Sequence, residues 1–212
     1  SALDEARAIG ARAIFLGDLV DAGPDSVGVL RLVLPLVAAG HAVLLRGNHD
    51  DKLLRRLTRP APKETRTLME LKAAPDADTL IPLALTVISA TPFWLTIGRV
   101  TLVHGAYHPD MLTCSSGGVG EVPTQLKALA LYGETDGTLD ADGFPIRTYR
   151  WVDRIPDGHQ AIVGHDIRCR DAPLMVQGAQ GGRALFLDTG AGKGGRLSTT
   201  QLRTPNCGPD QS

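Results

Sequence analysis

Two stretches of similar design decide the fold: AIFLGDLVD at residues 13–21 and AVLLRGNHD at residues 42–50. Each begins with a short apolar run and ends in a polar segment in which Gly is followed by Asp or Asn. This pattern is typical of a buried strand that delivers a loop. Residues 27–39, between them, carry apolar side chains at helical spacing, interrupted by Pro35. The sequence therefore predicts strand, helix and strand, with both loops at one edge of a sheet.

The rest of the chain continues as a mixture of strands and helices. We expect a helix over 51–58, a mostly helical segment over 61–91, and a β-hairpin over 93–103 that turns at Gly98-Arg99. Further strands are predicted at 160–163, 184–187 and 196–202, and loops at 114–120 and 133–144. There is no internal repeat or low-complexity linker, so residues 1–203 are predicted to form one domain, with 204–212 as a disordered tail.

Composition limits the function classes. The chain has 212 residues, of which 43% are hydrophobic and 21% charged, as expected for one soluble globular domain. Its net charge of −1 argues against a large basic surface for nucleic acid. No apolar run approaches the roughly 18 residues that span a bilayer. The cysteines are few and widely spaced, so a disulfide scaffold is not expected and the prediction is a cytoplasmic protein without a membrane partner.

Four predicted strand ends each carry a side chain that is a good metal ligand. They are Asp18, Asn48, His104 and His165. Because tens of residues separate them, no single helix brings them together, whereas the carboxyl edge of a sheet would. Oxygen and nitrogen donors without thiolate suit Mn, Fe or Zn rather than Ca. A carboxylate able to bridge two ions is what a dinuclear hydrolase needs, so we expect two divalent metal ions, with Mn foremost.

Each of these residues also has a structural alternative. Asp18 alone is most often a turn residue at a strand end, and Asn48 beside Gly47 is compatible with an ordinary left-handed turn. His104 and His165, taken singly, are more often hydrogen-bonded core histidines than ligands. It is the recurrence of one ligand class after four separate strands that favours a metal site.

The same segments resemble the sequence blocks of the calcineurin-like metallophosphoesterases. GDLVDAG at 17–23 is similar to their G-D-x-x-D-R-G block and GNHD at 47–50 to their G-N-H-(D/E) block, while VHG at 103–105 and GH at 164–165 fit the two later histidine blocks. The resemblance covers nearly the whole chain. It implies an α/β fold in which a β-sandwich is flanked by helices, and a phosphomonoester hydrolase in which metal-bound hydroxide is the nucleophile.

The resemblance also implies residue roles. Asp18 would bridge the two metal ions, and the side chains completing the shell of the second ion would be Asn48, His104 and His165. His49 would act as general acid or phosphate anchor, with Asp21 orienting its imidazole. Simple chemistry agrees, because a carboxylate partner helps an imidazole keep its proton at neutral pH. The structural alternatives are a surface turn for His49 and a solvated turn aspartate for Asp21.

Two departures from the family pattern stand out. The opening Asp-x-His block, which would supply ligands to the first metal, does not occur before Asp18, and with the non-Met start this predicts an N-terminally truncated sequence lacking the first strand. In addition, Ala22 stands where the family usually has an arginine that holds phosphate through a bidentate fork. Arg46, just before Gly47, is the candidate substitute for binding the substrate phosphate.

The substrate is the least determined feature. KLLR at 52–55, LYGET at 131–135, and DTG at 188–190 followed by GGRL at 194–197 are most similar to the phosphatase module of bacterial polynucleotide kinase-phosphatases. Phosphoprotein phosphatases and symmetrical diadenosine-tetraphosphate hydrolases share the earlier blocks. Nucleotide or polynucleotide ends, phosphoproteins and dinucleoside polyphosphates are therefore all compatible substrates. The alternative is a non-catalytic domain with one metal or none that serves as a binding or regulatory module.

One glycine-rich match is misleading. GAGKGG at 190–195 satisfies G-x-G-x-x-G, but a predicted strand follows it where a dinucleotide-binding unit needs a helix. Gly194 also stands where a phosphate-binding P-loop needs Ser or Thr after the lysine.

Overall fold

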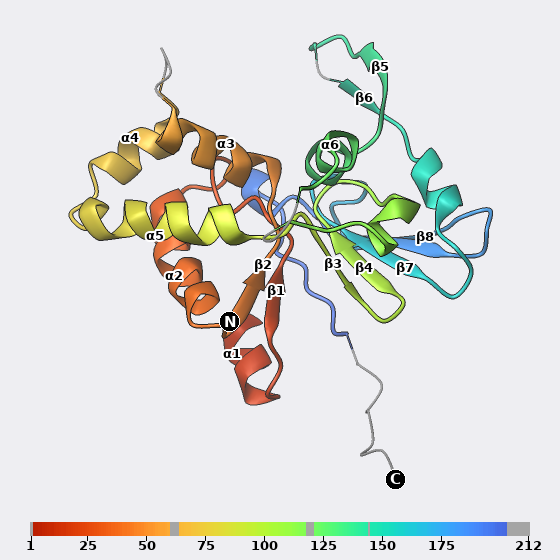
Figure 1. Cartoon of the computed structure of the whole chain (residues 1–212), viewed down its shortest axis with the longest axis horizontal. Helices are drawn as coiled ribbons and strands as arrows, with labels where there is room; N and C mark the ends of the chain where they lie inside the picture. The colour runs from red at the N-terminus through yellow and green to blue at the C-terminus, as the bar shows by residue number, and fades with distance from the viewer. Residues whose placement is uncertain (1, 60–63, 118–120, 144, 203–212) are drawn as a thin grey trace.

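The computed structural model describes residues 2–59, 64–117, 121–143 and 145–202. Its elements form successive layers (Figure 1): a layer of helices, a pair of parallel strands, a five-stranded sheet, and a further helix with two short 3-10 helices. A mixed α/β fold with sheets flanked by helices is therefore confirmed. The predicted tail at 204–212 lies outside the described residues, and the domain bounds of 1–203 stay a prediction.

The first two strands form the predicted parallel pair. β1 (Ala13–Phe15) lies beside β2 (Ala42–Leu44), with Ala13 opposite Ala42, and helix α2 (Ser26–Ala38) connects them. The carboxylate of Asp25 caps this helix by accepting a hydrogen bond from the backbone N–H of Gly28 at 2.7 Å. The helix continues through Pro35 and stops before Gly40, whose φ of 72° is open to glycine at low cost.

Three further helices complete the layer beside β1 and β2. They are α3 (Asn48–Thr58), α4 (Arg66–Lys72) and α5 (Ala77–Ala90). Together with α2 they bury one apolar cluster, whose fully covered members include Leu30, Leu34, Leu71 and Ile88. Helix α3 begins three residues before the predicted start at residue 51, because Gly47 and Asp50 cap it, so the GNHD segment is its first turn. A short helix α1 (Ala2–Ala8) precedes β1.

The second sheet has the order β3-β4-β7-β9-β8. Its strands are β3 (Trp94–Ile97), β4 (Val100–Val103), β7 (Gln160–Val163), β8 (Leu174–Gln177) and β9 (Arg183–Phe186). The predicted hairpin at 93–103 is confirmed, with Gly98 at φ 58° in its turn. The three central strands β4, β7 and β9 are parallel, so their carboxyl ends point to one edge.

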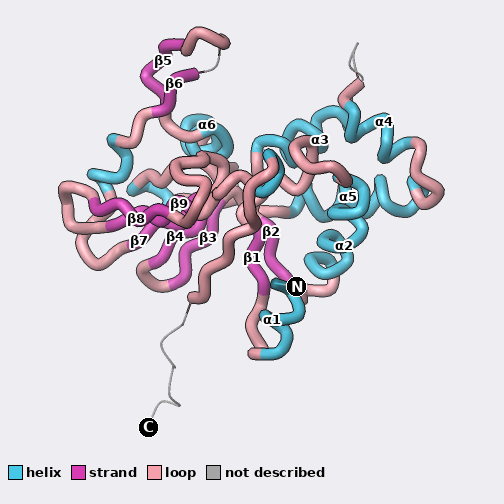
Figure 2. Tube along the Cα trace, turned by 180° about the vertical axis from the view of Figure 1, so that it is seen from behind, coloured by secondary structure: helices cyan, strands magenta, loops and turns pink. Residues whose placement is uncertain are grey.

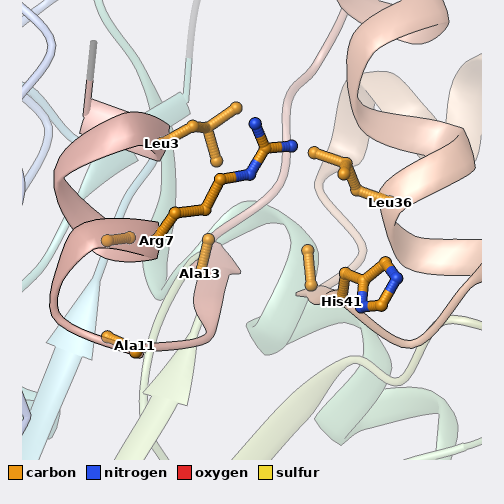
Figure 3. Close-up of a pocket in the computed structure, with 9 residues that line it drawn as sticks. Leu3, Arg7, Ala11, Ala13, Leu36 and His41 are labelled. Carbon is orange, nitrogen blue, oxygen red and sulfur yellow. The ribbon is translucent and has the colours of Figure 1, made fainter.

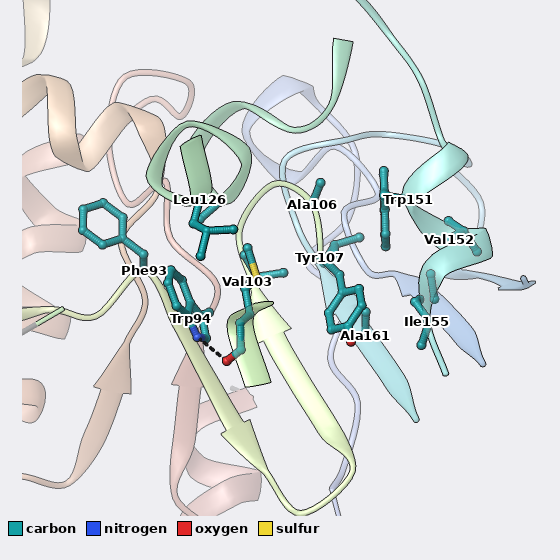
Figure 4. Close-up of a cluster of buried hydrophobic side chains, with 14 of the residues drawn as sticks. Phe93, Trp94, Val103, Ala106, Tyr107, Leu126, Trp151, Val152, Ile155 and Ala161 are labelled. Atoms are coloured by element: carbon teal, nitrogen blue, oxygen red, sulfur yellow. Dashed lines mark hydrogen bonds between the residues drawn. The ribbon is translucent and has the colours of Figure 1, made fainter. Parts of the chain in front are cut away.

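Two apolar clusters hold this sheet in place. One lies between the sheets and joins Ile14 of β1 to Leu102, Ile162 and Leu185 of the larger sheet. The other covers the opposite face under α6 (Thr124–Tyr132) and the 3-10 helices Pro109–Leu112 and Arg150–Arg154. There the buried indole of Trp94 donates a hydrogen bond to the carbonyl of Met111 at 2.9 Å (Figure 4), which satisfies the one polar atom that this side chain buries.

Some predicted elements differ from the structure. The strand expected at 196–202 is wrong: only isolated bridges from Arg196 to Thr189 and Gly190 form there, and Leu197 is 75% exposed. β8 was not predicted. The loop expected over 133–144 contains β5 (Thr135–Leu139), which pairs with β6 (Pro145–Arg147) in a hairpin that projects from the body (Figure 2). Every described residue of these two strands is exposed, so they lack the alternation of buried and exposed side chains that reveals a strand.

Within the described residues, no helix has both the length and the apolar character needed to cross a membrane.

Candidate metal centre

Three non-glycine residues of the described chain have a positive φ, and all three are residues that the sequence assigned to the site. They are Asp18 at 57°, Asp21 at 76° and His165 at 62°. This conformation is uncommon for residues other than glycine and persists only where surrounding contacts hold it. Its occurrence at these positions shows that the fold fixes the loops after β1 and β7 at a cost in backbone energy.

The loops after β1 and β2 lie against each other without intervening side chains. A Cβ placed on Gly17 would come within 2.4 Å of the backbone nitrogen of Gly47, and a Cβ on Gly47 within 2.3 Å of that of Asp18. Real Cβ atoms do not approach backbone so closely, so only glycine fits at both positions. This contact brings Asp18 and Asn48, which are thirty residues apart, to one place.

The carboxylate of Asp50 fixes the two loops together. One oxygen accepts hydrogen bonds from the backbone N–H groups of Asp18 at 2.8 Å and Gly47 at 3.0 Å, and the other accepts from Leu19 at 3.0 Å. Asp50 is fully buried, and burial followed by the nearby Asp18 charge raises its pKa to about 6. The sequence analysis did not single out this residue, although its place at the third position of a capped helix was a usable signal.

The four predicted ligands converge. The Nε2 atom of His104 lies 3.0 Å from Nδ1 of His165, 3.1 Å from Oδ1 of Asn48 and 3.3 Å from Oδ2 of Asp18. The corresponding atoms of the two histidines and the aspartate all lie within 4.8 Å of one another. Two of these side chains follow the strand pair and two follow β4 and β7, so the cluster lies at the junction of the two sheets.

These distances fit a single divalent ion. Donor atoms about 2.0–2.2 Å from a common centre lie roughly 2.9–3.6 Å apart in tetrahedral or octahedral arrangements. His104 is oriented for coordination, because its Nδ1 is 2.7 Å from the carbonyl of Leu16 and donates its proton there, leaving Nε2 as the ligand atom. Burial, with the positive charge of Arg147 beside it, lowers the pKa of His165 to about 3, so its imidazole is neutral.

His49 and Asp21 form a second constellation beside the ligands. Nδ1 of His49 lies 2.8 Å from Oδ2 of Asp21, and the backbone N–H of His49 donates to Oδ1 of Asp18 at 2.9 Å. The Asp21 carboxylate is further held by Lys52 at 2.9 Å and by the hydroxyl of Thr67 at 2.7 Å. These contacts come from helices α3 and α4, and Lys52 and Thr67 are site residues that sequence reasoning missed.

The pair favours the charged form of both partners. The hydrogen bond with Asp21 raises the pKa of His49 above its ordinary 6.5, and the bond with His49 holds the pKa of Asp21 below its ordinary 3.8. The stabilisation from His49 is therefore complete below pH 6.5 and is lost as pH rises through its folded pKa. That from Asp21 is complete above pH 3.8 and is lost as pH falls through its folded pKa, so the pair contributes fully between these two values.

Arg46 is not brought to the site. Its side chain is buried, and one guanidinium nitrogen donates to the carbonyls of Ile88 at 2.7 Å and Ser89 at 2.8 Å at the end of α5. It also lies 3.7 Å from the Asp51 carboxylate and stacks over the ring of Phe93. These contacts turn Arg46 into the interior, where it joins α5 to the start of α3, and they do not favour the predicted phosphate contact.

A different arginine reaches the cluster. Arg147, at the end of β6, places one guanidinium nitrogen 2.6 Å from Nε2 of His165 and another 3.2 Å from the carboxylate of Asp166. Its side chain is 37% exposed, so the fork faces both the ligands and solvent. No sequence signal pointed to this residue, because it lies on an exposed strand within a segment predicted as a loop.

The base of the hairpin is fixed, which fixes Arg147. The carboxylate of Glu134 accepts hydrogen bonds from the hydroxyl of Thr148 at 2.8 Å and from Arg154, and its carbonyl accepts from the N–H of Thr148 at 2.8 Å. The Arg147 side chain passes over Gly133, where an added Cβ would lie 3.8 Å from its Cδ. The projecting hairpin thus carries its arginine to the cluster from a rigid base.

A cavity of about 440 Å³ lies away from this cluster. It is enclosed by α1, the end of α2 and the first residues of β1 and β2, with Arg7 and His41 at its wall (Figure 3). Because the candidate metal ligands follow the carboxyl ends of the strands and the cavity is lined by the first residues of β1 and β2, the cavity lies at the opposite end from the cluster.

Comparison with known proteins places this geometry in context. A family model described as calcineurin-like phosphoesterase matches residues 1–162. The asymmetrical bis(5′-nucleosyl)-tetraphosphatase PrpE of Geobacillus thermodenitrificans is 28% identical over 199 residues, covering 90% of this chain and 74% of that protein. The symmetrical bis(5′-nucleosyl)-tetraphosphatase of Ralstonia nicotianae is 30% identical, covering 89% of this chain and 79% of that protein.

Solved structures agree on the fold. A crystal structure of a protein provisionally described as a diadenosine tetraphosphatase has a TM-score of 0.53 and 25% identity, covering 92% of this chain and 80% of its own. A serine/threonine phosphatase from Saccharomyces cerevisiae with similarity to human phosphatase PP5 also has a TM-score of 0.53, at 15% identity over 88% of this chain and 62% of its own. The second likeness concerns the fold alone.

The contacts of His49 predict that two substitutions shift its pKa in opposite directions. Asp21→Asn removes the carboxylate that raises the pKa of His49, so the pKa of His49 should fall. Lys52→Met removes a positive charge that lowers this pKa, so it should rise. NMR titration of the His49 ring measures both. Shifts of the same sign in the two variants would contradict the assigned contacts.

The position of Arg46 makes a stability prediction. Arg46→Met leaves buried carbonyls of Ile88 and Ser89 without a donor and should lower the free energy of unfolding by about 2–4 kcal/mol. Arg59→Met, at an exposed position just after α3, is the matched control and should change it by no more than about 0.5 kcal/mol. Urea denaturation measures both. An unchanged urea midpoint for Arg46→Met, together with a raised KM for a phosphoester substrate, would instead indicate that Arg46 binds the substrate.

Proposed function

Because this chain belongs to the calcineurin-like phosphoesterase family, we propose that the cluster of Asp18, Asn48, His104 and His165 is the centre of a metal-dependent phosphoester hydrolase. The family predicted from the sequence is thereby confirmed, and with it a metallophosphoesterase. The observation that carries the site assignment is the convergence of the donor atoms of three side chains within 3.0–3.3 Å of Nε2 of His104.

Divalent ions bound there would polarise the phosphoryl oxygens and lower the pKa of a coordinated water, so that it is a nucleophile at neutral pH. The four residues of the cluster directly support the binding of one ion. In the predicted pair of ions, Asp18 would be shared. Among the described residues, one group of three or more His, Cys, Asp or Glu side chains has metal-ligand spacing, so the second ion and its identity as Mn rest on the family resemblance.

His49 is the proposed general acid. Its Nδ1 is occupied by Asp21, which leaves Nε2 to face the substrate, and its backbone N–H holds Asp18 in the cluster. A protonated imidazole within reach of the leaving oxygen can neutralise the alkoxide as the bond to phosphorus breaks. Asp21 is the positioning residue: it orients the ring and sustains its positive charge. Lys52 and Thr67 in turn hold Asp21.

Arg147 is the proposed phosphate ligand in place of the arginine that Ala22 replaces. Its guanidinium is directed at the metal-ligand cluster and is partly open to solvent, and a planar fork suits the bidentate binding of a phosphate. The contacts of Glu134 at the base of the hairpin support this role. They fix the backbone that carries Arg147, so the side chain loses less conformational entropy when it binds a phosphate.

The relatives favour nucleotide substrates. Their names describe enzymes that act on bis(5′-nucleosyl) tetraphosphates, and a dinucleoside polyphosphate is the substrate class we propose first. Polynucleotide ends, suggested by the resemblance to polynucleotide kinase-phosphatases, and phosphoproteins are the other classes to be compared.

Activity and metal binding should disappear together when the shared carboxylate is removed. With added Mn²⁺, the wild-type chain should hydrolyse p-nitrophenyl phosphate, and Asp18→Asn should reduce kcat by at least about 100-fold and reduce the bound metal. Asp78→Asn, at an exposed position of α5, is the control and should change neither. Metal analysis of the wild-type protein counts one or two ions per chain. Absence of turnover by the metal-loaded wild type would instead support the non-catalytic binding module.

The role of His49 is separated from mere phosphate binding by the leaving group. Phenyl phosphate needs a proton on its leaving oxygen more than p-nitrophenyl phosphate does. His49→Ala should therefore reduce kcat on phenyl phosphate by about 10²–10⁴-fold and on p-nitrophenyl phosphate at least about 10-fold less. Equal losses on the two substrates would show that His49 binds phosphate and does not donate a proton.

A further inference from the structure

The glycine-rich segment at 190–194 forms a defined loop after β9. Residues Ala191–Lys193 form a 3-10 turn between Gly190 at φ 84° and Gly194 at φ 80°. The carboxylate of Asp188 accepts a hydrogen bond from the N–H of Gly190 at 2.8 Å, and the N–H of Lys193 donates to the carbonyl of Gly190 at 2.8 Å. The loop has a fixed shape even though its residues are largely exposed.

This loop lies against the proposed site. A Cβ placed on Gly192 would come within 2.7 Å of the Cβ of Ala22, the residue that follows Asp21. The neighbouring residue, Lys193, is therefore held beside the segment that carries the His49–Asp21 pair. A larger side chain at position 22 or 192 would separate the loop from this segment, so the small residues at both positions belong together.

A second loop, the one that begins with His165, joins it. One guanidinium nitrogen of Arg170 donates to the carbonyl of Lys193 at 3.3 Å. A Cβ on Gly190 would lie 3.1 Å from the same nitrogen and 3.3 Å from Cδ1 of Ile167. The guanidinium of Arg170 thus lies against the backbone of Lys193, on two loops that leave the parallel strands β7 and β9 at the same edge as His165.

These two cations lack the partners that the other cations of the site have. Lys52 is paired with Asp21 at 2.9 Å and Arg147 with Asp166 at 3.2 Å. Within the part of the chain that the structure describes, no carboxylate lies within 4.0 Å of the charged nitrogens of Arg170 or Lys193.

The two loops carry other charged residues besides Arg170 and Lys193. Arg168 is directed elsewhere, stacked 3.4 Å over the ring centroid of Tyr149. The acids of the two loops, Asp166, Asp171 and Asp188, form no ion pair with Arg170 or Lys193: Asp166 is paired with Arg147, and Asp188 accepts a hydrogen bond from the N–H of Gly190. Arg170 and Lys193 are the two cations whose residues are in contact here, and Arg196, also exposed and without a carboxylate within 4.0 Å among the described residues, lies on the same loop.

We propose that Arg170 and Lys193 form a subsite for the phosphates of the substrate that are not being hydrolysed. The ligand class is a linear polyphosphate, in which one phosphate lies at the metal-ligand cluster and the next ones extend along the loops after β7 and β9. This inference rests on the proposed function, since it assumes that the cluster holds the phosphate under attack. It explains why both cations are exposed and unpaired beside the site: a chain of linked phosphates supplies the missing negative charge.

The test compares inorganic tripolyphosphate with orthophosphate by calorimetry on the metal-loaded protein, freed of excess metal. Arg170→Gln and Lys193→Gln should each weaken tripolyphosphate binding roughly 5-fold, the size expected for one exposed ion pair, and orthophosphate binding clearly less. Arg170→Lys retains the charge while changing the contact to the Lys193 carbonyl, and should retain most of the affinity. Arg183→Gln, exposed at the start of β9 and so at the other end of the sheet, is the charge-matched control and should change neither affinity.

Kinetics give the same comparison where the enzyme turns over. In each Gln variant, the fold-increase in the KM for diadenosine tetraphosphate should be roughly 5 times the fold-increase in the KM for p-nitrophenyl phosphate. Equal weakening of tripolyphosphate and orthophosphate, no weakening of either, or an effect of Arg183→Gln as large as that of Arg170→Gln would overturn the subsite. A wild-type protein that binds tripolyphosphate in this way but hydrolyses no phosphoester would refute the proposed function and leave the subsite standing.

Discussion

The site depends on one close contact between two stretches of backbone, at Gly17 and Gly47. Neither position has room for a Cβ, so the loops after β1 and β2 meet directly, and the Asp50 carboxylate accepts hydrogen bonds from both. This contact alone brings the backbone of Asp18 next to that of Asn48 and His49. The positive φ of Asp18 is the local cost, of about 1–3 kcal/mol for such a conformation.

The loops held by this contact carry or adjoin histidines in two different electrostatic environments. On one side, burial keeps His165 neutral and a carbonyl orients His104, which suits both for holding a cation. On the other side, Asp21 keeps His49 charged, which suits it for giving up a proton. The pKa values of the two histidines move in opposite directions, because burial with nearby positive charge lowers that of His165 and the hydrogen bond with the Asp21 carboxylate raises that of His49.

The sequence predicted the positions that end a buried strand and failed for those that do not. Asp18, Asn48, His104 and His165 follow apolar runs whose burial is easily recognised, and strands that run parallel bring their ends to one edge. Arg46 also follows such a run, but adjacency along the chain does not determine which way a long side chain turns, and here the carbonyls at the end of α5 bind it. Arg147 was missed because its strand is exposed and has no apolar periodicity. The start of α3 was misplaced because its capping residue is Gly47, which equally suits a turn.

The position of the cluster has a mechanical consequence. Asp18 and Asn48 belong to the strand pair and His104 and His165 to the five-stranded sheet, so the ligands stand on both sides of the seam that Ile14, Leu102 and Ile162 fill. An ion bound there would join the two sheets, which otherwise contact each other through this apolar cluster and through hydrogen bonds such as that from His104 to the carbonyl of Leu16. Metal binding would then also stabilise the contact between the two sheets. The metal-free protein would be less stable at this contact than the metal-bound one.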